Sequence, residues 1–254
     1  NEKKFNSDVR DFMRMLLAEN VRDFSAWKAQ CFEAKEYLSK YDIQPGNLTV
    51  MRISSMLPEN PMVSVDVGMH QCWCAQSLHL RGNKGRINIG GGYGSMGCGL
   101  PYAIGSSISL NNGKVFCISG DGGFQMNIQE LETVKREQLP IKMFILNNRV
   151  LGKISETQHF NHGDRFAATA VSGGYTVPNF QKIAKAYGIK AATLSSYKDL
   201  DNYKSWFEDN EPCLFDISLP EETFLTPKIK FETGVMLPKL DDSVFVKVMG
   251  ILSK

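Results

Sequence analysis

Hydrophobic residues follow two spacing patterns along this chain. Near the N-terminus they recur at helical spacing, which predicts amphipathic helices over 8–18 and 23–41. Pro45 and Gly46 then interrupt the pattern. From residue 62 onward, short and continuous apolar runs alternate with helical stretches.

The apolar runs predict buried strands, and the stretches between them predict helices. The expected strands are 62–67, 86–89, 114–119, 141–148, 190–194 and 213–219. The expected helices lie near 70–79, 101–110, 127–137, 178–187 and 199–208. This alternation predicts an α/β fold, a doubly wound and mostly parallel sheet with helices on both faces. The segment after Pro220 is irregular, ends in a possible helix over 242–252, and is a possible cover for a site.

Charge and composition narrow the class of protein. The 254 residues carry 29 Lys and Arg against 27 Asp and Glu, a formal net charge of +2. This balance gives no electrostatic footprint for nucleic acid or an anionic membrane. With 43% hydrophobic and 22% charged residues the composition is that of an ordinary globular protein. No signal peptide and no apolar run of the ~18–20 residues that a membrane span needs is visible, so we expect a cytoplasmic protein.

Six cysteines invite a disulfide or metal interpretation, but their context favours neither. Cys117 and Cys213 fall inside predicted strands, where a small buried thiol is the simpler explanation. Cys72 and Cys74 have the right chemistry for zinc but lack the spacing of a zinc signature.

Two glycine clusters, 90–97 and 120–123, follow predicted strands. Ligands of open α/β sheets bind at the carboxyl ends of strands, so both clusters are candidate binding loops. Neither is a Walker loop, because no Gly-Lys-Ser/Thr follows. Gly92, Gly94 and Gly97 fit the bare dinucleotide spacing, which leaves a nicotinamide site as an alternative. The acidic residue that such a site requires would be Asp121, which lies between glycines and suits a metal better.

Gly120-Asp121-Gly122 and Asn147-Asn148 together predict a metal–diphosphate site. A carboxylate at a strand end can hold a hard cation, and glycines let backbone amides approach phosphate oxygens. One helix and one strand fit the gap between the two motifs, so both should meet at one sheet edge. Mg²⁺ takes oxygen ligands, often including substrate phosphates. The alternative is that Asn147-Asn148 only caps a turn.

The two motifs at this separation resemble the thiamine diphosphate (ThDP) binding motif. The surrounding sequence is similar to the C-terminal diphosphate-binding domain of acetolactate synthase-like enzymes, from about residue 45 to 218. The matching stretches are DVGMHQCW (66–73), GGYGSMGCGLPYAIG (91–105), GDGGFQMNIQELETV (120–134) and FILNNRVLG (144–152).

The resemblance implies roles for specific residues. Mg²⁺ would be held by Asp121, Asn148 and the backbone carbonyl of Val150. Met96 would hold ThDP in its bent conformation; the alternative is that Met96 is an ordinary core residue. The expected cofactor-binding residues are His70, Gly94, Ser95, Met96, Asp121, Gly122, Gly123, Asn148, Val150, Leu151 and Gly152. His70 is alternatively a helix-start residue without a ligand, and the family has Gln where this chain has Met69.

The substrate region departs from the resembled pattern. Acetolactate synthases carry Gln-Gly-Met and a later Trp, whereas this chain has Leu151-Gly152-Lys153 and Thr157. Lys153 and Thr157 are therefore candidate substrate residues. Lys153 could pair with an anionic substrate or be a solvated surface lysine.

The resemblance also implies partners. In the family, the catalytic glutamate beside the cofactor's pyrimidine lies on a separate pyrimidine-binding domain, usually of a partner subunit. We interpret 1–44 as the end of a central domain with a connecting helix, 45–219 as the ThDP domain and 220–254 as a tail. The first residue, Asn1, is not Met, and we expect a fragment that is inactive alone, from a homodimeric or tetrameric enzyme.

The expected activity is that of a 2-keto acid carboligase or decarboxylase, a lyase or transferase dependent on ThDP and Mg²⁺. One alternative is a decarboxylase or tailoring enzyme of sugar or polysaccharide metabolism. Another is a non-catalytic subunit that retains ThDP binding.

Overall fold

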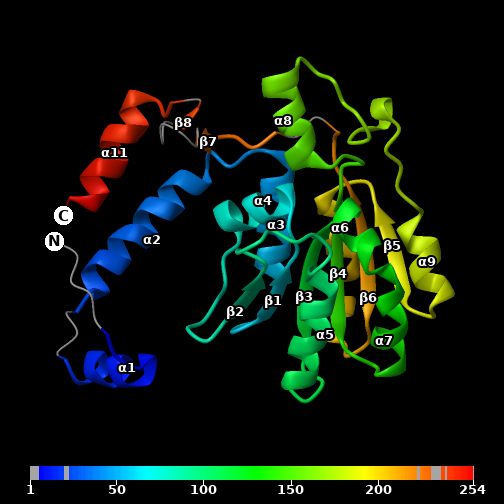
Figure 1. Cartoon of the computed structure of the whole chain (residues 1–254), viewed down its shortest axis with the longest axis horizontal. Coiled ribbons are helices and arrows are strands. Elements are labelled where there is room, and N and C mark those ends of the chain that lie inside the picture. The colour runs from blue at the N-terminus through cyan, green and yellow to red at the C-terminus, as the bar shows by residue number, and fades with distance from the viewer. Residues whose placement is uncertain (1–5, 20–22, 222–223, 230–235, 238, 254) are drawn as a thin grey trace. The chain divides into compact units, whose positions relative to one another are not determined.

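The computed structural model describes residues 6–19, 23–221, 224–229, 236–237 and 239–253 (Figure 1). The chain forms two compact units, one of residues 41–239 and the other of 1–40 with 240–254. The domain boundaries predicted from the sequence stay predictions. Parts of the predicted N-terminal remnant and of the predicted tail lie outside the described residues.

The larger unit is built on a six-stranded sheet, all parallel, in the order β2-β1-β3-β4-β6-β5. Its strands are β1 (Met62–Val65), β2 (Arg86–Ile89), β3 (Val115–Gly120), β4 (Ile141–Asn147), β5 (Lys190–Leu194) and β6 (Cys213–Ser218). After β2 the chain returns to the other side of β1 to form β3. This reversal makes the carboxyl ends of β1 and β3 a topological switch point, where open α/β sheets bind ligands.

Helices and short 3-10 turns separate the strands. The helices are α3 (Pro45–Met56), α4 (Met69–Ser77), α5 (Gly99–Ser109), α6 (Asp121–Met126), α7 (Leu131–Arg136), α8 (Gly152–His162), α9 (Phe180–Ala186) and α10 (Lys204–Glu208). The 3-10 turns are η1 (Ile128–Glu130), η2 (Val171–Gly173) and η3 (Tyr197–Tyr203). A two-stranded ribbon, β7 (Lys228–Ile229) with β8 (Met236–Leu237), follows the sheet.

Successive side chains of the central strands point to opposite faces of the sheet and pack into two hydrophobic cores. Phe144 and Leu146 of β4 join the core under α3, α4 and α10. Met143 and Ile145 of the same strand join the core under α5, α7 and α9 on the other face. Because β4 is buried along its whole length, every side chain of the strand needs a covering layer. The predicted doubly wound α/β fold is confirmed.

Three helical elements differ from the prediction. Pro45 does not only break the chain but is the first residue of α3, a position where its missing amide hydrogen costs nothing. A separate helix, α6, begins at Asp121 itself, so the Gly-Asp-Gly motif spans a strand end and a helix start. α8 was not expected, because its sequence lacks an apolar stripe at helical spacing.

The smaller unit contains α1 (Val9–Ala18), α2 (Ser25–Ser39) and α11 (Asp242–Leu252). Ala34 of α2 packs against Val244, Val248 and Ile251 of α11. The C-terminal helix predicted over 242–252 is confirmed, and it shares a small core with the predicted connecting helix. In the described part of the chain, no helix combines the length and apolar character of a membrane span.

Candidate functional site

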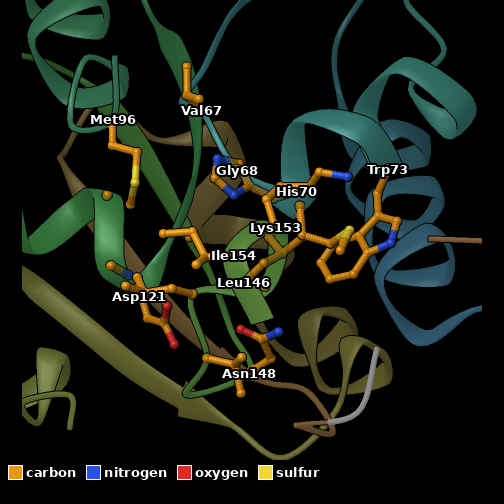
Figure 2. A pocket seen from close by; sticks show the side chains of 17 residues that line it. Val67, Gly68, His70, Trp73, Met96, Asp121, Leu146, Asn148, Lys153 and Ile154 are labelled. Atoms are coloured by element: carbon orange, nitrogen blue, oxygen red, sulfur yellow. Dashed lines mark hydrogen bonds between the residues drawn. The ribbon is translucent and has the colours of Figure 1, made fainter. Parts of the chain in front are cut away.

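A cleft lies at the carboxyl ends of β1, β3 and β4, within the larger unit (Figure 2). It encloses about 440 Å³ of empty space, part of it open to solvent. The lining residues that the sequence singled out are His70, Met96, Asp121, Gly122, Gly123, Asn148, Val150, Leu151, Gly152 and Lys153. The loops after three strands therefore meet at one sheet edge, as the motif spacing predicted.

Asp121 lies at the end of β3 and is 2% exposed. One carboxylate oxygen, Oδ1, accepts hydrogen bonds from the Gly122 amide at 2.6 Å and the Tyr175 hydroxyl at 3.3 Å. The other, Oδ2, is buried and has no hydrogen-bond partner among the described residues. Burial raises the pKa of Asp121 to about 6, against the hydrogen bonds that favour the charged form. Buried polar atoms are normally hydrogen-bonded, so a buried carboxylate oxygen without a partner is a candidate metal ligand.

The two asparagines after β4 have different surroundings. Asn147 donates to Asp216 at 2.8 Å, and its carbonyl oxygen accepts from the Arg149 amide at 3.2 Å. Arg149 has a positive φ of 58°, so the chain turns sharply here. Asn147 thus caps the turn, while Asn148 is buried and lines the cleft. The turn-cap alternative therefore describes the first asparagine, whereas the second asparagine is a residue of the cleft wall.

The turn after β4 is held close to Asp121. The Arg149 amide lies near enough to the Asp121 carboxylate to lower its pKa, against the larger effect of burial. In Figure 2, Asp121 and Asn148 lie toward the same end of the cleft, away from Val67. Val150, the third predicted metal ligand, is buried and lines the same cleft. A carboxylate, an amide and a backbone carbonyl form a hard oxygen set, which suits Mg²⁺.

Gly122 and Gly123 form the cradle beside Asp121. A Cβ on Gly122 would clash with Leu151 and lie 3.4 Å from the Met96 methyl. Both glycines line the cleft, and without side chains their backbone borders it directly. The Gly122 amide donates to Asp121 Oδ1, whereas the Gly123 amide lies in the first turn of α6, where backbone amides have no intrahelical acceptor and can bind an anion.

His70 lies near the start of α4, packed behind the strand ends. Its ring comes so close to Gly120 that a Cβ there would lie 2.8 Å from Nδ1. Its Nε2 is buried without a hydrogen-bond partner among the described residues. Burial lowers the pKa of His70 to about 4, against the opposing charge of Asp66, so the ring is neutral at pH 7.

Met96 projects from the first glycine loop into the cleft, as Figure 2 shows. Gly94 and Ser95 are exposed and are not among the lining residues. Thr157 is also exposed, and its hydroxyl donates to the Lys153 carbonyl at 3.1 Å. Lys153 lines the cleft and donates to Glu156 at 2.8 Å.

The sequence analysis missed several residues of the site. Val67, Trp73, Leu146 and Ile154 supply apolar parts of the cleft wall. In the sequence they read as ordinary core residues, and only the fold shows that they reach the sheet edge. Tyr175, whose hydroxyl reaches Asp121, lies 54 residues along the chain and carries no motif.

These observations fit the cofactor and metal that the resemblance implies. Asp121 Oδ2 is a candidate metal ligand, because it is buried and has no hydrogen-bond partner among the described residues. The Gly122–Gly123 backbone borders the cleft, and His70 Nε2 is a second buried polar atom that a ligand could contact. All three line one cleft.

Comparison with known proteins supports the same family. Residues 66–217 match the family of thiamine pyrophosphate enzymes, C-terminal TPP binding domain. The acetolactate synthase large subunit of Porphyra purpurea is 33% identical over 87% of this chain and 39% of its own length. Acetolactate synthase isozyme 2 large subunit of Escherichia coli is 34% identical over 77% of this chain and 36% of its own. A probable acetolactate synthase large subunit of Methanocaldococcus jannaschii is 28% identical over 97% of this chain.

The chain spans roughly two fifths of the length of these relatives. The predicted family is confirmed, and the matched region covers all three strand ends that build the cleft. The chain belongs to the thiamine pyrophosphate enzymes and carries their C-terminal TPP binding domain, similar to that of acetolactate synthase large subunits.

Proposed function

We propose that the cleft binds ThDP through a Mg²⁺ ion held by Asp121, Asn148 and the Val150 carbonyl. The observation that carries this proposal is the buried Asp121 Oδ2, which has no partner in the part of the chain that is described. Leaving a buried carboxylate oxygen unpaired costs about 1–3 kcal/mol or more, which a bound cation would offset.

The remaining cofactor contacts are those that the family resemblance implies, including Gly94 and Ser95, which do not line the cleft themselves. The amides of Gly122 and Gly123, with His70 and the Leu151-Gly152 turn, would face the diphosphate. Gly94, Ser95 and Met96 would face the aminopyrimidine, with Met96 as the support of the bent cofactor. When bound, ThDP supplies a nucleophilic carbon for breaking or forming the bond beside a keto group. This chain's own contribution is to hold and orient the cofactor and to exclude water with Trp73 and its apolar neighbours.

The activity we propose is that of a 2-keto acid carboligase or decarboxylase, a lyase or transferase in the cytoplasm. It would be complete only with a pyrimidine-binding domain, from the same full-length chain or from a partner subunit in a homodimer or tetramer. The relatives' names support this activity, because acetolactate synthases are the proteins to which the cleft region is similar.

A departure at the cleft wall favours a substrate other than that of acetolactate synthase. Lys153 lines the cleft, and its side chain is 42% exposed. Both Lys153 and Lys228 pair with the single carboxylate of Glu156, so these three side chains together carry one net positive charge. We therefore propose that Lys153, with Thr157 one helical turn along, selects a substrate with an additional anionic group. A sugar- or polysaccharide-tailoring enzyme and a non-catalytic ThDP-binding subunit stay as alternatives.

Thermal unfolding of the purified chain tests the cofactor proposal. A ligand that binds only the native state raises the melting temperature. ThDP with Mg²⁺ should raise it, whereas NAD or ThDP with a chelator should not. A rise with NAD alone would replace the proposal with a nicotinamide site. In the complete enzyme, Lys153→Met should shift preference from anionic toward neutral second substrates, and an unchanged preference would remove Lys153 from the substrate site.

A further inference from the structure

Asp66 is a buried carboxylate to which the sequence analysis assigned no role. It directly follows β1 and is 1% exposed. Its Oδ1 accepts hydrogen bonds from the Val67 amide at 2.7 Å and the Gly97 amide at 2.9 Å. Its Oδ2 accepts from the Ser119 hydroxyl at 2.9 Å. One side chain therefore ties together the ends of β1 and β3 and the first glycine loop.

The Gly97 contact fixes the loop that carries Met96. Positions 91–95 of this loop are exposed, so their own packing does little to hold them. At Gly97 the amide donates to Asp66, and the carbonyl accepts from the Asn127 side chain at 2.7 Å. Gly97 also has a positive φ of 87°, and a Cβ there would lie 2.8 Å from Met126. The residue after Met96 is thus held on both sides.

The same carboxylate touches the other two parts of the site. A Cβ on Gly123 would clash with Asp66 Oδ2, so the backbone of the glycine cradle rests directly on the carboxylate. The His70 ring interacts with the Asp66 backbone through a hydrogen bond and with its charge. Asp66 does not line the cleft itself.

We propose that Asp66 is a positioning residue of the site: its Oδ1 locks the Met96 loop onto the strand ends, the Gly122–Gly123 cradle and His70. This inference rests on the proposed function for what the positioned residues bind. The locking itself is independent of any ligand.

Amide hydrogen exchange tests the locking without a cofactor. In the unmodified chain, the Gly97 amide should exchange at least about 100-fold more slowly than those of the exposed Gly92 and Gly94, because it is buried and hydrogen-bonded. Equal rates at the three glycines would overturn the proposal, and this comparison needs no variant.

Two substitutions of Asp66 distinguish the loss of its hydrogen bond to Gly97 from a general loss of stability. Asp66→Ala removes the acceptor and should speed Gly97 exchange about 10- to 100-fold more than exchange of core amides in β4. Asp66→Asn keeps an oxygen for the Val67 and Gly97 amides, while its new NH₂ can donate to the Ser119 hydroxyl. It should restore Gly97 exchange to within about tenfold of the original rate. Equal effects at Gly97 and in β4 would reduce Asp66 to a structural residue.

Asp209→Ala is the matched control. Asp209 also accepts several hydrogen bonds, from Lys142 at 2.7 Å and the Glu211 amide at 3.0 Å, but it lies at the opposite edge of the sheet. It should destabilise the fold without changing relative exchange at Gly97. Titration with Mg²⁺–ThDP then adds the functional readout. Asp66→Ala should weaken affinity about tenfold or more while still folded, whereas Asp66→Asn and Asp209→Ala should not.

The outcomes for the two proposals are distinct. If the unmodified chain binds no Mg²⁺–ThDP, the proposed function fails, but the exchange result still decides the role of Asp66. If the chain binds Mg²⁺–ThDP and Asp66→Ala binds it equally well, the positioning role is wrong.

Discussion

Replacing Asp121 with Asn should make the metal-free chain more stable while removing its metal site. Burial raises the pKa of Asp121 from 3.8 to about 6. Between these two values the folded state holds a proton that the unfolded state has lost, so stability falls as pH rises. Above pH 6, ionisation of the buried Asp121 lowers the free energy of unfolding by up to about 3 kcal/mol. An asparagine at this position does not ionise, so the variant does not lose this stability.

The net gain should be smaller than the full cost. The amide oxygen can still accept from Gly122 and Tyr175, but the NH₂ group takes the place of Oδ2, which has no partner. A buried donor without a partner costs about 1–3 kcal/mol. The pH dependence is the sharper quantity, because this constant penalty does not enter it. The advantage of the variant should grow by about 1 kcal/mol between pH 5 and pH 8.

Urea unfolding of both proteins in the presence of a chelator measures this difference. His70 titrates with the opposite sign: its pKa is lowered to about 4, so its contribution is lost as pH falls below 6.5. Subtracting the two proteins at each pH cancels His70 and isolates Asp121. A stability difference that is constant from pH 5 to pH 8 would refute the reasoning, because Asp121 would then titrate normally.

Two further substitutions test packing around the cleft. Gly46→Ala drives a methyl group into the buried Trp73 ring and should lower the free energy of unfolding by about 1–3 kcal/mol in urea, despite better helix propensity; equal or higher stability would show that Trp73 moves aside freely. Glu156→Ala removes the acceptor of both Lys228 and the Leu225 amide, so Leu225 exchange should accelerate about tenfold; unchanged exchange would mean that Glu156 does not hold this segment.

The sequence brought Asp121 and Asn148 together as a predicted metal site because the signal for each residue is local. Asp121 and Asn148 each follow a buried apolar strand, and parallel strands bring their carboxyl ends to one edge. Motif, strand pattern and topology rule were sufficient to place both residues at one cleft.

What the sequence did not predict depends on contacts between distant segments. Asp66 is one carboxylate at a strand end, and only the fold brings it to the Gly97 amide, 31 residues away. Tyr175 reaches Asp121 from an irregular segment without periodicity. α8 lacks an apolar stripe, and its position depends on contacts such as that of Glu156 with Lys228.

Electron paramagnetic resonance of Mn²⁺, used in place of Mg²⁺, tests the central claim most directly. With ThDP present, binding to the unmodified chain should reduce the signal of free Mn²⁺. With Asp121→Asn, the signal of free Mn²⁺ should stay unchanged. Binding of Mn²⁺ that is equal in both proteins would contradict the assignment of Asp121 as the metal ligand and, with it, the proposed site.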